Sequence, residues 1–413
     1  MSQYNTHTLS NGLRIIHLAE ESEVVYCGYA MKAGTRDEAD KKEHGLAHFC
    51  EHMTFKGTQK RSSLQVINTL EKIGGELNAF TAKEETVYYA AVLRQFFNRA
   101  VDLLTDIVFH SEYPQGAVER EIEVVCDEIE SYNDSPAELI YDEFENALFH
   151  NNSLGHSILG TPDCVRSFTT ADCRRFTKRL YTPNNAVFYV IGNIDFNKLV
   201  KRLESLLSCS SAEKALLRKV SQYDASSSRE RAGNEVMDLN THQNHVMLST
   251  TITDDIERWR IPLFLVNNIL GGPGMNSRLN VSLREKRGLV YTVESIMTAY
   301  TDALVWSTYF GCDRADLKRC LRLTMSELHK LRKTQMSNAA LLAAKRQIKG
   351  QMALASQNRE SLAIDMAKQY LHYGKLKDNQ ETFKRIDAVT SEDIHTLMNS
   401  MLTEDKLFTL IFK

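Results

Sequence analysis

The chain has 413 residues, which is more than one ordinary hydrophobic core accommodates and favours two domains. Its 50 basic and 53 acidic residues give a net charge of -3, so it lacks the basic excess typical of nucleic-acid-binding proteins. No apolar run reaches the roughly eighteen residues that a membrane-spanning helix needs.

The N-terminal segment and the cysteines predict a cytoplasmic protein. Residues 1–7 have neither the basic n-region nor the apolar h-region of a secretory signal. The eight cysteines form no C-x-x-C pair, which is more typical of a reducing compartment than of a disulfide framework. We therefore expect neither a membrane nor a nucleic acid among its partners.

Residues 48–52 read His-Phe-Cys-Glu-His, the H-x-x-E-H signature of inverted zinc peptidases, in a segment with helical periodicity. On a helix, His48 and His52 lie one turn apart on the same face and can bind one metal ion. Glu51 borders that face, where a carboxylate can act as general base on a water. So short a pattern needs support from a third ligand, because a catalytic zinc usually takes three.

Residues 74–91 predict a hairpin. Gly74-Gly75 end a helix, residues 76–81 have the character of a short strand, and residues 86–91 are its expected partner. In a plain hairpin of this kind, Phe80 is expected to be a core residue.

A strong helix is predicted around residues 119–129, because Pro114 lies near its start and apolar residues recur at helical spacing. Glu121 and Glu128 are seven residues apart and share one face. A solvated acidic face would explain either glutamate alone, but the pair is the best source of a third ligand. Cys126 and Cys50 point away from the ligand positions, and Gly45 places His44 before the zinc helix.

The chain reads as two α+β halves of one plan, residues 1–207 and 234–413, joined by a polar linker over 208–233. Each half is expected to hold an antiparallel or mixed sheet packed against helices. Each opens with two strands, predicted over 13–18 and 24–33 and over 236–239 and 245–251. Each closes with a capped helix and a strand, 169–191 and 390–412.

The second half lacks metal ligands in the corresponding place. Its counterpart of the zinc helix, predicted over about 262–270, contains neither His nor Glu. Farther on, Arg284 and Tyr291 have side chains that can donate hydrogen bonds to an oxyanion. The alternative for this pair is a surface arginine beside an ordinary strand tyrosine.

These motifs resemble the pitrilysin/insulinase family of zinc metallopeptidases, which includes the mitochondrial processing peptidase. In that family the third ligand lies some seventy-odd residues beyond the second histidine, and Glu128 lies 76 beyond His52 (128 − 52). Residues 45–49 and 51–58 resemble the family's core block. The resemblance covers essentially the whole chain.

The resemblance implies specific roles for the residues already singled out. It implies the fold of the mitochondrial processing peptidase, with one Zn²⁺ per chain bound by His48, His52 and Glu128 and assisted by Glu121. An extended peptide would lie along the strand that carries Asn78, Ala79 and Phe80. Arg284 and Tyr291 would bind the scissile carbonyl.

The predicted activity is zinc-dependent hydrolysis of unfolded peptides, with Glu51 as general base. Chains of this length in the family usually pair, so a homodimer of the short bacterial type is expected, with a chamber and a composite site. The alternative is a non-catalytic scaffold or partner subunit of a hetero-oligomer. A purely structural zinc site is a more remote alternative, because such sites are usually closed by a fourth ligand.

Overall fold

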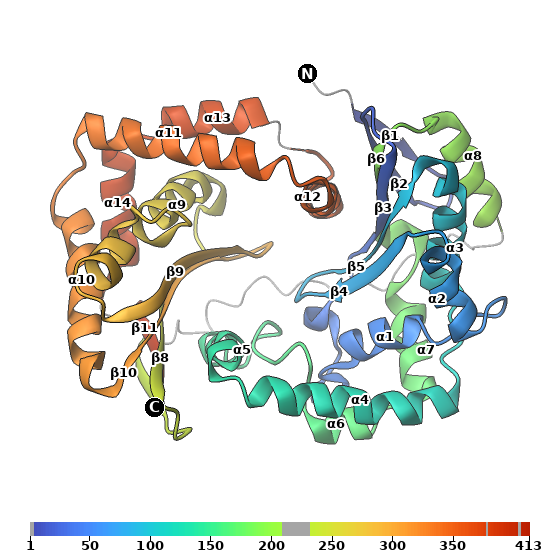
Figure 1. Ribbon diagram of the computed structural model, residues 1–413, viewed down its shortest axis with the longest axis horizontal. Coiled ribbons are helices and arrows are strands. Elements are labelled where there is room, and N and C mark those ends of the chain that lie inside the picture. The colour runs from blue at the N-terminus through green and yellow to red at the C-terminus, as the bar shows by residue number, and fades with distance from the viewer. Residues whose placement is uncertain (1–3, 209–231, 377–378, 404–405) are drawn as a thin grey trace. The chain divides into compact units, whose positions relative to one another are not determined.

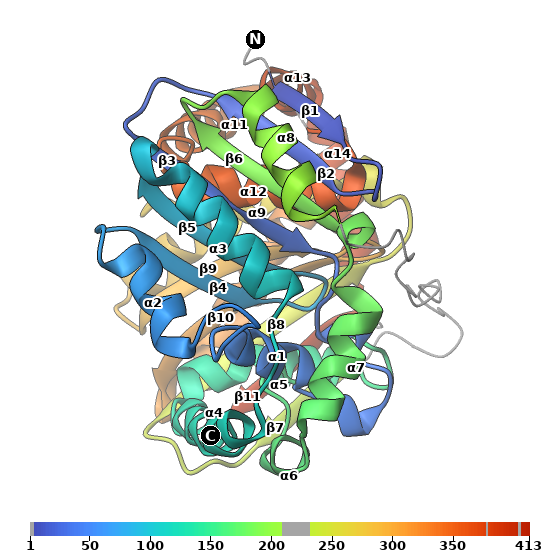
Figure 2. The same ribbon diagram turned by 90° about the vertical axis from the view of Figure 1, so that its right-hand side faces the viewer.

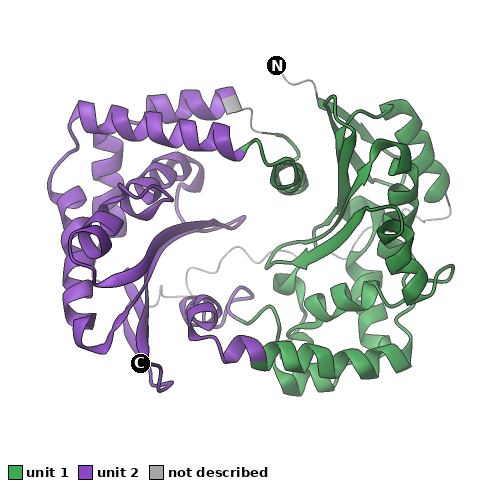
Figure 3. Ribbon diagram, in the orientation of Figure 1, with its two compact units in different colours: residues 1–130, 156–220, 356–376 green, residues 131–155, 221–355, 377–413 purple. Residues whose placement is uncertain are grey.

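The computed structural model describes residues 4–208, 232–376, 379–403 and 406–413 (Figure 1). Residues 209–231, most of the predicted linker, lie outside the described residues. The chain divides into two compact units, residues 1–130, 156–220 and 356–376 and residues 131–155, 221–355 and 377–413 (Figure 3). Within the described ranges, no helix has the length and apolar content that crossing a bilayer requires.

Unit 1 is built on a six-stranded mixed sheet in the order β1-β2-β6-β3-β5-β4. β6 runs parallel to β2 and antiparallel to β3, and β4 is an edge strand paired antiparallel with β5. The strands are β1 Tyr4–Thr8, β2 Arg14–Ala19, β3 Val24–Met31, β4 Glu76–Thr81, β5 Thr86–Leu93 and β6 Ala186–Gly192. The predicted hairpin of residues 76–91 is thereby confirmed.

Helices cover both faces of this sheet because its strands are apolar on both sides. Along β6, Phe188 and Val190 belong to the core under α3 and α8, whereas Tyr189 and Ile191 belong to the cluster under α12. Figure 2 shows α3 and α8 in front of the sheet and α12 behind it. The helices of unit 1 are α1 Leu46–Thr54, α2 Ser63–Glu71, α3 Phe97–Phe109, α4 Gln115–Asn133 (its last three residues grouping with unit 2), α6 Pro162–Arg166, α7 Thr170–Leu180, α8 Phe196–Leu206 and α12 Arg359–Tyr373.

Unit 2 repeats this plan with a five-stranded sheet in the order β7-β11-β8-β10-β9. β11 runs parallel to β7 and antiparallel to β8, as β6 does between β2 and β3. The strands are β7 Gly233–Met237, β8 Gln243–Ile252, β9 Val290–Ala299, β10 Leu304–Asp313 and β11 Phe408–Phe412. The helices are α5 Pro136–Leu148, α9 Ile256–Gly271, a π-helical turn Asn280–Glu285, α10 Leu317–Lys333, α11 Asn338–Ala355, α13 Asn379–Ala388 and α14 Ser391–Met401.

The closing helix of each unit begins with the same local structure. Thr169 caps α7 and forms a capping box with Asp172, and Thr390 caps α14 and forms one with Asp393. Each helix is followed by an interior strand of its sheet, β6 after α7 and β11 after α14. The predicted repeat of an α+β half is therefore confirmed at the level of elements, pairing and caps.

The packing does not follow the predicted division of the sequence, because two helices pack with the sheet of the other sequence half. On α5, Ile140, Phe144 and Leu148 pack with Phe408 and Leu410 of β11. α12 packs on β3 and β6 of unit 1. α5 and α12 occupy corresponding positions in the two halves of the sequence. Because each packs on the sheet of the other half, the two halves exchange one helix.

The counterpart of the zinc helix begins earlier than predicted. α9 starts at Ile256, and Pro262 lies inside it instead of opening it. A proline in a helix interior costs about 3 kcal/mol through its missing N–H and its ring clash. Burial of Trp259 and Ile261 in the turn before the proline offsets that cost.

Candidate active site

The short helix α1 has one face in the core and the opposite face towards β4 and α4. Phe49, Cys50 and Met53 are buried in the core of unit 1, and Cys50 faces the backbone carbonyl of Cys173. This leaves His48, Glu51 and His52 on the remaining face. The predicted direction of Cys50 is confirmed.

Three side chains converge between α1 and α4 in the manner of a metal site. The ligating atoms of His48, His52 and Glu128 all lie within 4.8 Å of one another. Nε2 of His48 is 3.9 Å from Oε1 of Glu128, and Nε2 of His52 is 3.5 Å from Oε2. The described residues contain no other group of this kind.

The donor set fits zinc. Two imidazole nitrogens and one carboxylate oxygen are a frequent ligand set of catalytic zinc, which keeps a fourth position for water or substrate. Glu128 remains 43% exposed at its side chain, so the group is open on that side. Burial, reinforced by the charge of His52, lowers the pKa of His48 to about 3, and this keeps its imidazole in the neutral, ligating form.

Glu121 orients the second histidine. Its Oε1 lies 3.0 Å from Nδ1 of His52, and its Oε2 lies 2.6 Å from Nζ of Lys56. A proton on Nδ1 leaves Nε2 free to face Glu128, which is the arrangement that metal-bound histidines adopt with a carboxylate partner. Burial opposes ionisation of Glu121, but the hydrogen bonds from His52 and Lys56 outweigh it and lower its pKa.

Glu51 is buried beside the two histidines and is held by the end of β4. Its Oε2 accepts a hydrogen bond of 3.1 Å from Oγ1 of Thr81. Burial raises the pKa of Glu51, against the opposing influence of His52 and Thr81. Sequence reasoning assigned no role to Thr81. The signal was the strand alternation, which puts Thr81 on the same face as Ala79 and Leu77, two residues that pack against the core containing α1.

The predicted substrate strand is β4, which lies at the edge of its sheet and so leaves one row of backbone groups unpaired with another strand. Asn78 is exposed, and Ala79 and Phe80 are half-buried. Phe80 packs in the cluster with α12, on the sheet face opposite to Thr81. Its ring therefore supports the strand from the far side.

Arg284 and Tyr291 belong to unit 2 and lie next to each other. The guanidinium of Arg284, in the π-helical turn, is 6.0 Å from the ring centroid of Tyr291 at the start of β9. Tyr291 is 85% exposed. The structure thus brings the pair together, and its approach to His48, His52 and Glu128 stays a prediction.

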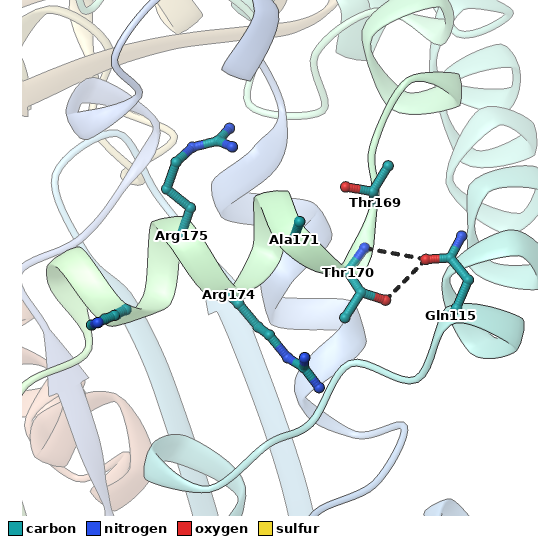
Figure 4. A pocket seen from close by; sticks show the side chains of 7 residues that line it. Gln115, Thr169, Thr170, Ala171, Arg174 and Arg175 are labelled. Atoms are coloured by element: carbon teal, nitrogen blue, oxygen red, sulfur yellow. Dashed lines mark hydrogen bonds between the residues drawn. The ribbon is translucent and has the colours of Figure 1, made fainter.

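Residues that line a pocket at the start of α7 form hydrogen bonds with the beginning of α4. Oε1 of Gln115, the first residue of α4, accepts hydrogen bonds from the backbone N–H and the hydroxyl of Thr170, at 3.4 and 3.0 Å (Figure 4). Arg174 donates to the carbonyl of Glu112, just before α4. These contacts tie the beginning of α4 to α7, and α1 also packs against α7.

Comparison with known proteins identifies relatives over nearly the whole chain. Residues 14–162 match the family model described as insulinase, peptidase family M16, and residues 167–348 match the one described as peptidase M16 inactive domain. The uncharacterized zinc protease YmxG of Bacillus subtilis is 32% identical over 98% of this chain and 97% of its own length. An uncharacterized zinc protease of Streptomyces coelicolor is 32% identical over 96% of this chain and 86% of its own length.

Two solved structures share the fold. One, from Pseudomonas fluorescens, is described as a peptidase M16 inactive domain; it superposes with a TM-score of 0.89 at 18% identity, covering 99% of this chain and 97% of that chain. The other is a protease from Helicobacter pylori, with a TM-score of 0.88 at 20% identity, covering 100% of this chain and 99% of that chain.

Proposed function

Because the chain belongs to the insulinase family of peptidases, family M16, we propose that it is a zinc-dependent endopeptidase that hydrolyses unfolded peptides. The observation that carries this proposal is the convergence of His48, His52 and Glu128 with the buried carboxylate of Glu51 beside them. This arrangement combines a metal ligand set with a general base.

One zinc ion per chain, held by His48, His52 and Glu128, would polarise both the attacking water and the scissile carbonyl. Glu51 removes a proton from the water and later delivers it to the leaving amine. The raised pKa of Glu51 favours the first of these proton transfers, because it makes the carboxylate a stronger base. Glu121 holds His52 in its ligating tautomer, and Thr81 holds Glu51.

The substrate is an extended peptide that pairs with the edge of β4. Backbone hydrogen bonds to a strand edge accept any sequence, provided that the peptide is unfolded. Arg284 and Tyr291 then donate hydrogen bonds to the carbonyl oxygen as it becomes negative. We propose that two chains pair around a chamber and that this pair of residues acts in the same chain or in the partner.

Cleavage of a quenched fluorescent peptide of about fifteen residues tests the function, with a folded protein as the second substrate. We expect cleavage of the peptide alone, loss of activity with a chelator, and recovery on adding zinc. Failure of zinc-loaded protein to cleave any peptide would favour the alternative, a scaffold or partner subunit without its own activity.

A further inference from the structure

The zinc helix α1 has no cap of its own. Its N-cap is Gly45, with a φ of 93°, so no side chain at that position can accept the N–H groups of the first turn. Glu38 supplies the acceptor from outside the helix. Its Oε1 accepts from the backbone N–H of Ala47 at 2.9 Å, and both its oxygens lie 3.1 Å from the N–H of Gly45.

The carboxylate of Glu38 is itself held by a buried histidine. Its side chain is fully buried, and Oε2 lies 2.8 Å from Nε2 of His156. The ring of His156 stacks on that of His44, with centroids 3.9 Å apart. The backbone also fits closely here, because a Cβ at Gly45 would lie 2.5 Å from the carbonyl oxygen of Leu159. The start of α1 is therefore fixed by Glu38 and its surroundings together.

The segment that carries Glu38 also binds the turn of the β4–β5 hairpin. The N–H of Thr35 donates to the carbonyl of Ala82 at 3.2 Å, and that of Arg36 donates to the carbonyl of Lys83 at 2.8 Å. Lys83 in turn donates from Nζ to the carbonyl of His156. The zinc helix and the substrate strand are thus connected through one short segment.

His48 depends on this connection more than His52 does. Nδ1 of His52 is oriented by Glu121, whereas Nδ1 of His48 is buried and has no hydrogen-bond partner in the described part of the chain. The direction of His48 must therefore come from the backbone of α1. His48 directly follows Ala47, the residue whose N–H Glu38 binds.

We propose that Glu38 is a positioning residue of the metal site, which fixes the start of α1 and thereby the direction of His48 and the distance of α1 from β4. The inference rests on the proposed function. It assigns to Glu38 an effect on metal affinity and turnover beyond any effect on folding.

The test compares Glu38→Gln with Glu85→Gln. Glu85 is a matched control, because it is also a buried carboxylate that faces a histidine Nε2, that of His372, at 2.8 Å, but it anchors α12. Zinc affinity is measured by competition with a chromophoric chelator, the visible spectrum is recorded after Co²⁺ substitution, and kcat and KM are measured at saturating zinc.

For Glu38→Gln we expect zinc affinity to fall by about 10–100-fold, the range found when residues that orient metal ligands are removed. The Co²⁺ spectrum should change and kcat should fall, with KM within about twofold of the wild type. Glu85→Gln should retain zinc affinity, spectrum and kcat. Unchanged zinc affinity and spectrum in Glu38→Gln, or equal losses in Glu85→Gln, would overturn the proposal.

Glu38→Asp keeps the test decisive if Glu38→Gln does not fold. It retains the carboxyl group, but the shorter side chain cannot reach Ala47 and His156 together. An intermediate zinc affinity is therefore expected, and a wild-type value would overturn the proposal. A wild-type protein that binds zinc and cleaves no peptide would overturn the proposed function alone, because the zinc affinities still decide the role of Glu38.

Discussion

The two units share the order of five strands and a similar sequence of helices, yet among the described residues only unit 1 brings together a group of side chains that could bind a metal ion. α1 holds two histidines and a glutamate in nine residues, whereas its counterpart α9 has no histidine in sixteen and a single acidic residue, Glu257. α4 brings Glu121 and Glu128 to the site, whereas its counterpart α11 has no acidic residue at all. The repeat therefore conserves the scaffold and differs in its chemistry.

Unit 2 adopts this fold without a counterpart of the His48, His52 and Glu128 group among its described residues, so the fold does not depend on such a group. In α9, Leu263, Leu265 and Val266 are fully buried, and burial of such side chains stabilises by about 1.5–3 kcal/mol each. In α1, His48 and Glu51 are buried polar groups, which cost free energy unless they are paired. Unit 1 thus retains groups that do not favour folding, and variants of these groups should change function before stability.

The largest effect is expected for Glu51→Gln. Loss of the general base should lower kcat by about 10²–10⁴-fold, while zinc content stays at one per chain because the three ligands remain. Turnover and metal analysis of the same sample check this. Glu257→Gln in α9 is the control from the other unit and should retain full activity. An active Glu51→Gln protein would remove Glu51 from the role of base.

The next largest effect is expected for Glu128→Gln, which replaces the proposed third ligand, on α4, with an amide side chain. Zinc affinity should fall steeply and activity with it, measured by chelator competition. Glu123→Gln, an exposed glutamate on the same helix, should leave both unchanged. Zinc affinity equal to that of the wild type would indicate that Glu121, or another residue, is the third ligand.

Mixing two inactive proteins tests whether Arg284 and Tyr291 of unit 2 act at the site of their own chain or at that of a partner. Glu51→Gln chains retain Arg284 and Tyr291, and chains with Tyr291→Phe retain Glu51. If a homodimer shares its sites, random exchange gives half mixed dimers with one intact site each, so about a quarter of wild-type activity should return. Exchange is verified by mass spectrometry. Absence of recovery after verified exchange would place each site within one chain.

Thr81→Val tests a single contact within unit 1, because it removes one hydroxyl and nearly preserves the volume of the side chain. Loss of a single hydrogen bond to Glu51 is worth about 0.5–1.5 kcal/mol, so kcat should fall by about 3–10-fold with little change in KM. Thr86→Val is the matched control, since Thr86 lies in the same hairpin but its hydroxyl donates to the carbonyl of Ala33, which follows β3. Equal kcat losses in both variants would assign the effect to the hairpin in general.

Sequence patterns predicted the elements of the site well, because each depends on local spacing. The i, i+4 histidines on α1, the in-phase glutamates on α4 and the capped helices before β6 and β11 are all visible within a few turns. The exchange of α5 and α12 was not predictable, because an apolar stripe such as Ile140, Phe144 and Leu148 shows that a helix is buried and not which sheet buries it.

Contacts between distant segments were also missed. Glu38 and His156 are 118 residues apart, and no local pattern marks either as the partner of the other. The start of α9 was placed too late because proline is frequent at helix starts, and the buried turn before Pro262 overrides that preference.

The last prediction concerns stability instead of turnover: it is about the contact that anchors the exchanged helix α12, and about how that contact depends on pH. Glu85 lies 2.6 Å from Nζ of Lys368 and 2.8 Å from Nε2 of His372. Burial alone would raise the pKa of Glu85, but the hydrogen bonds and charges of these two residues outweigh burial and lower it. The folded state therefore favours the carboxylate. Its contribution to stability is present above the unfolded pKa of about 4.5 and is lost as pH falls through the lower folded pKa.

Glu85→Gln should accordingly be less stable than the wild type at pH 7, by about 1–3 kcal/mol, and the difference should shrink as the pH falls below about 4.5. Urea unfolding of both metal-free proteins at pH 7, 5 and 4 measures it, with a chelator present so that zinc release does not contribute. A difference that stays constant over this range would mean that Glu85 acts through its packing. α12 would then be held on its sheet by the apolar contacts of Ala363, Met366 and Leu371, much as α5 is held in unit 2 by its own apolar face.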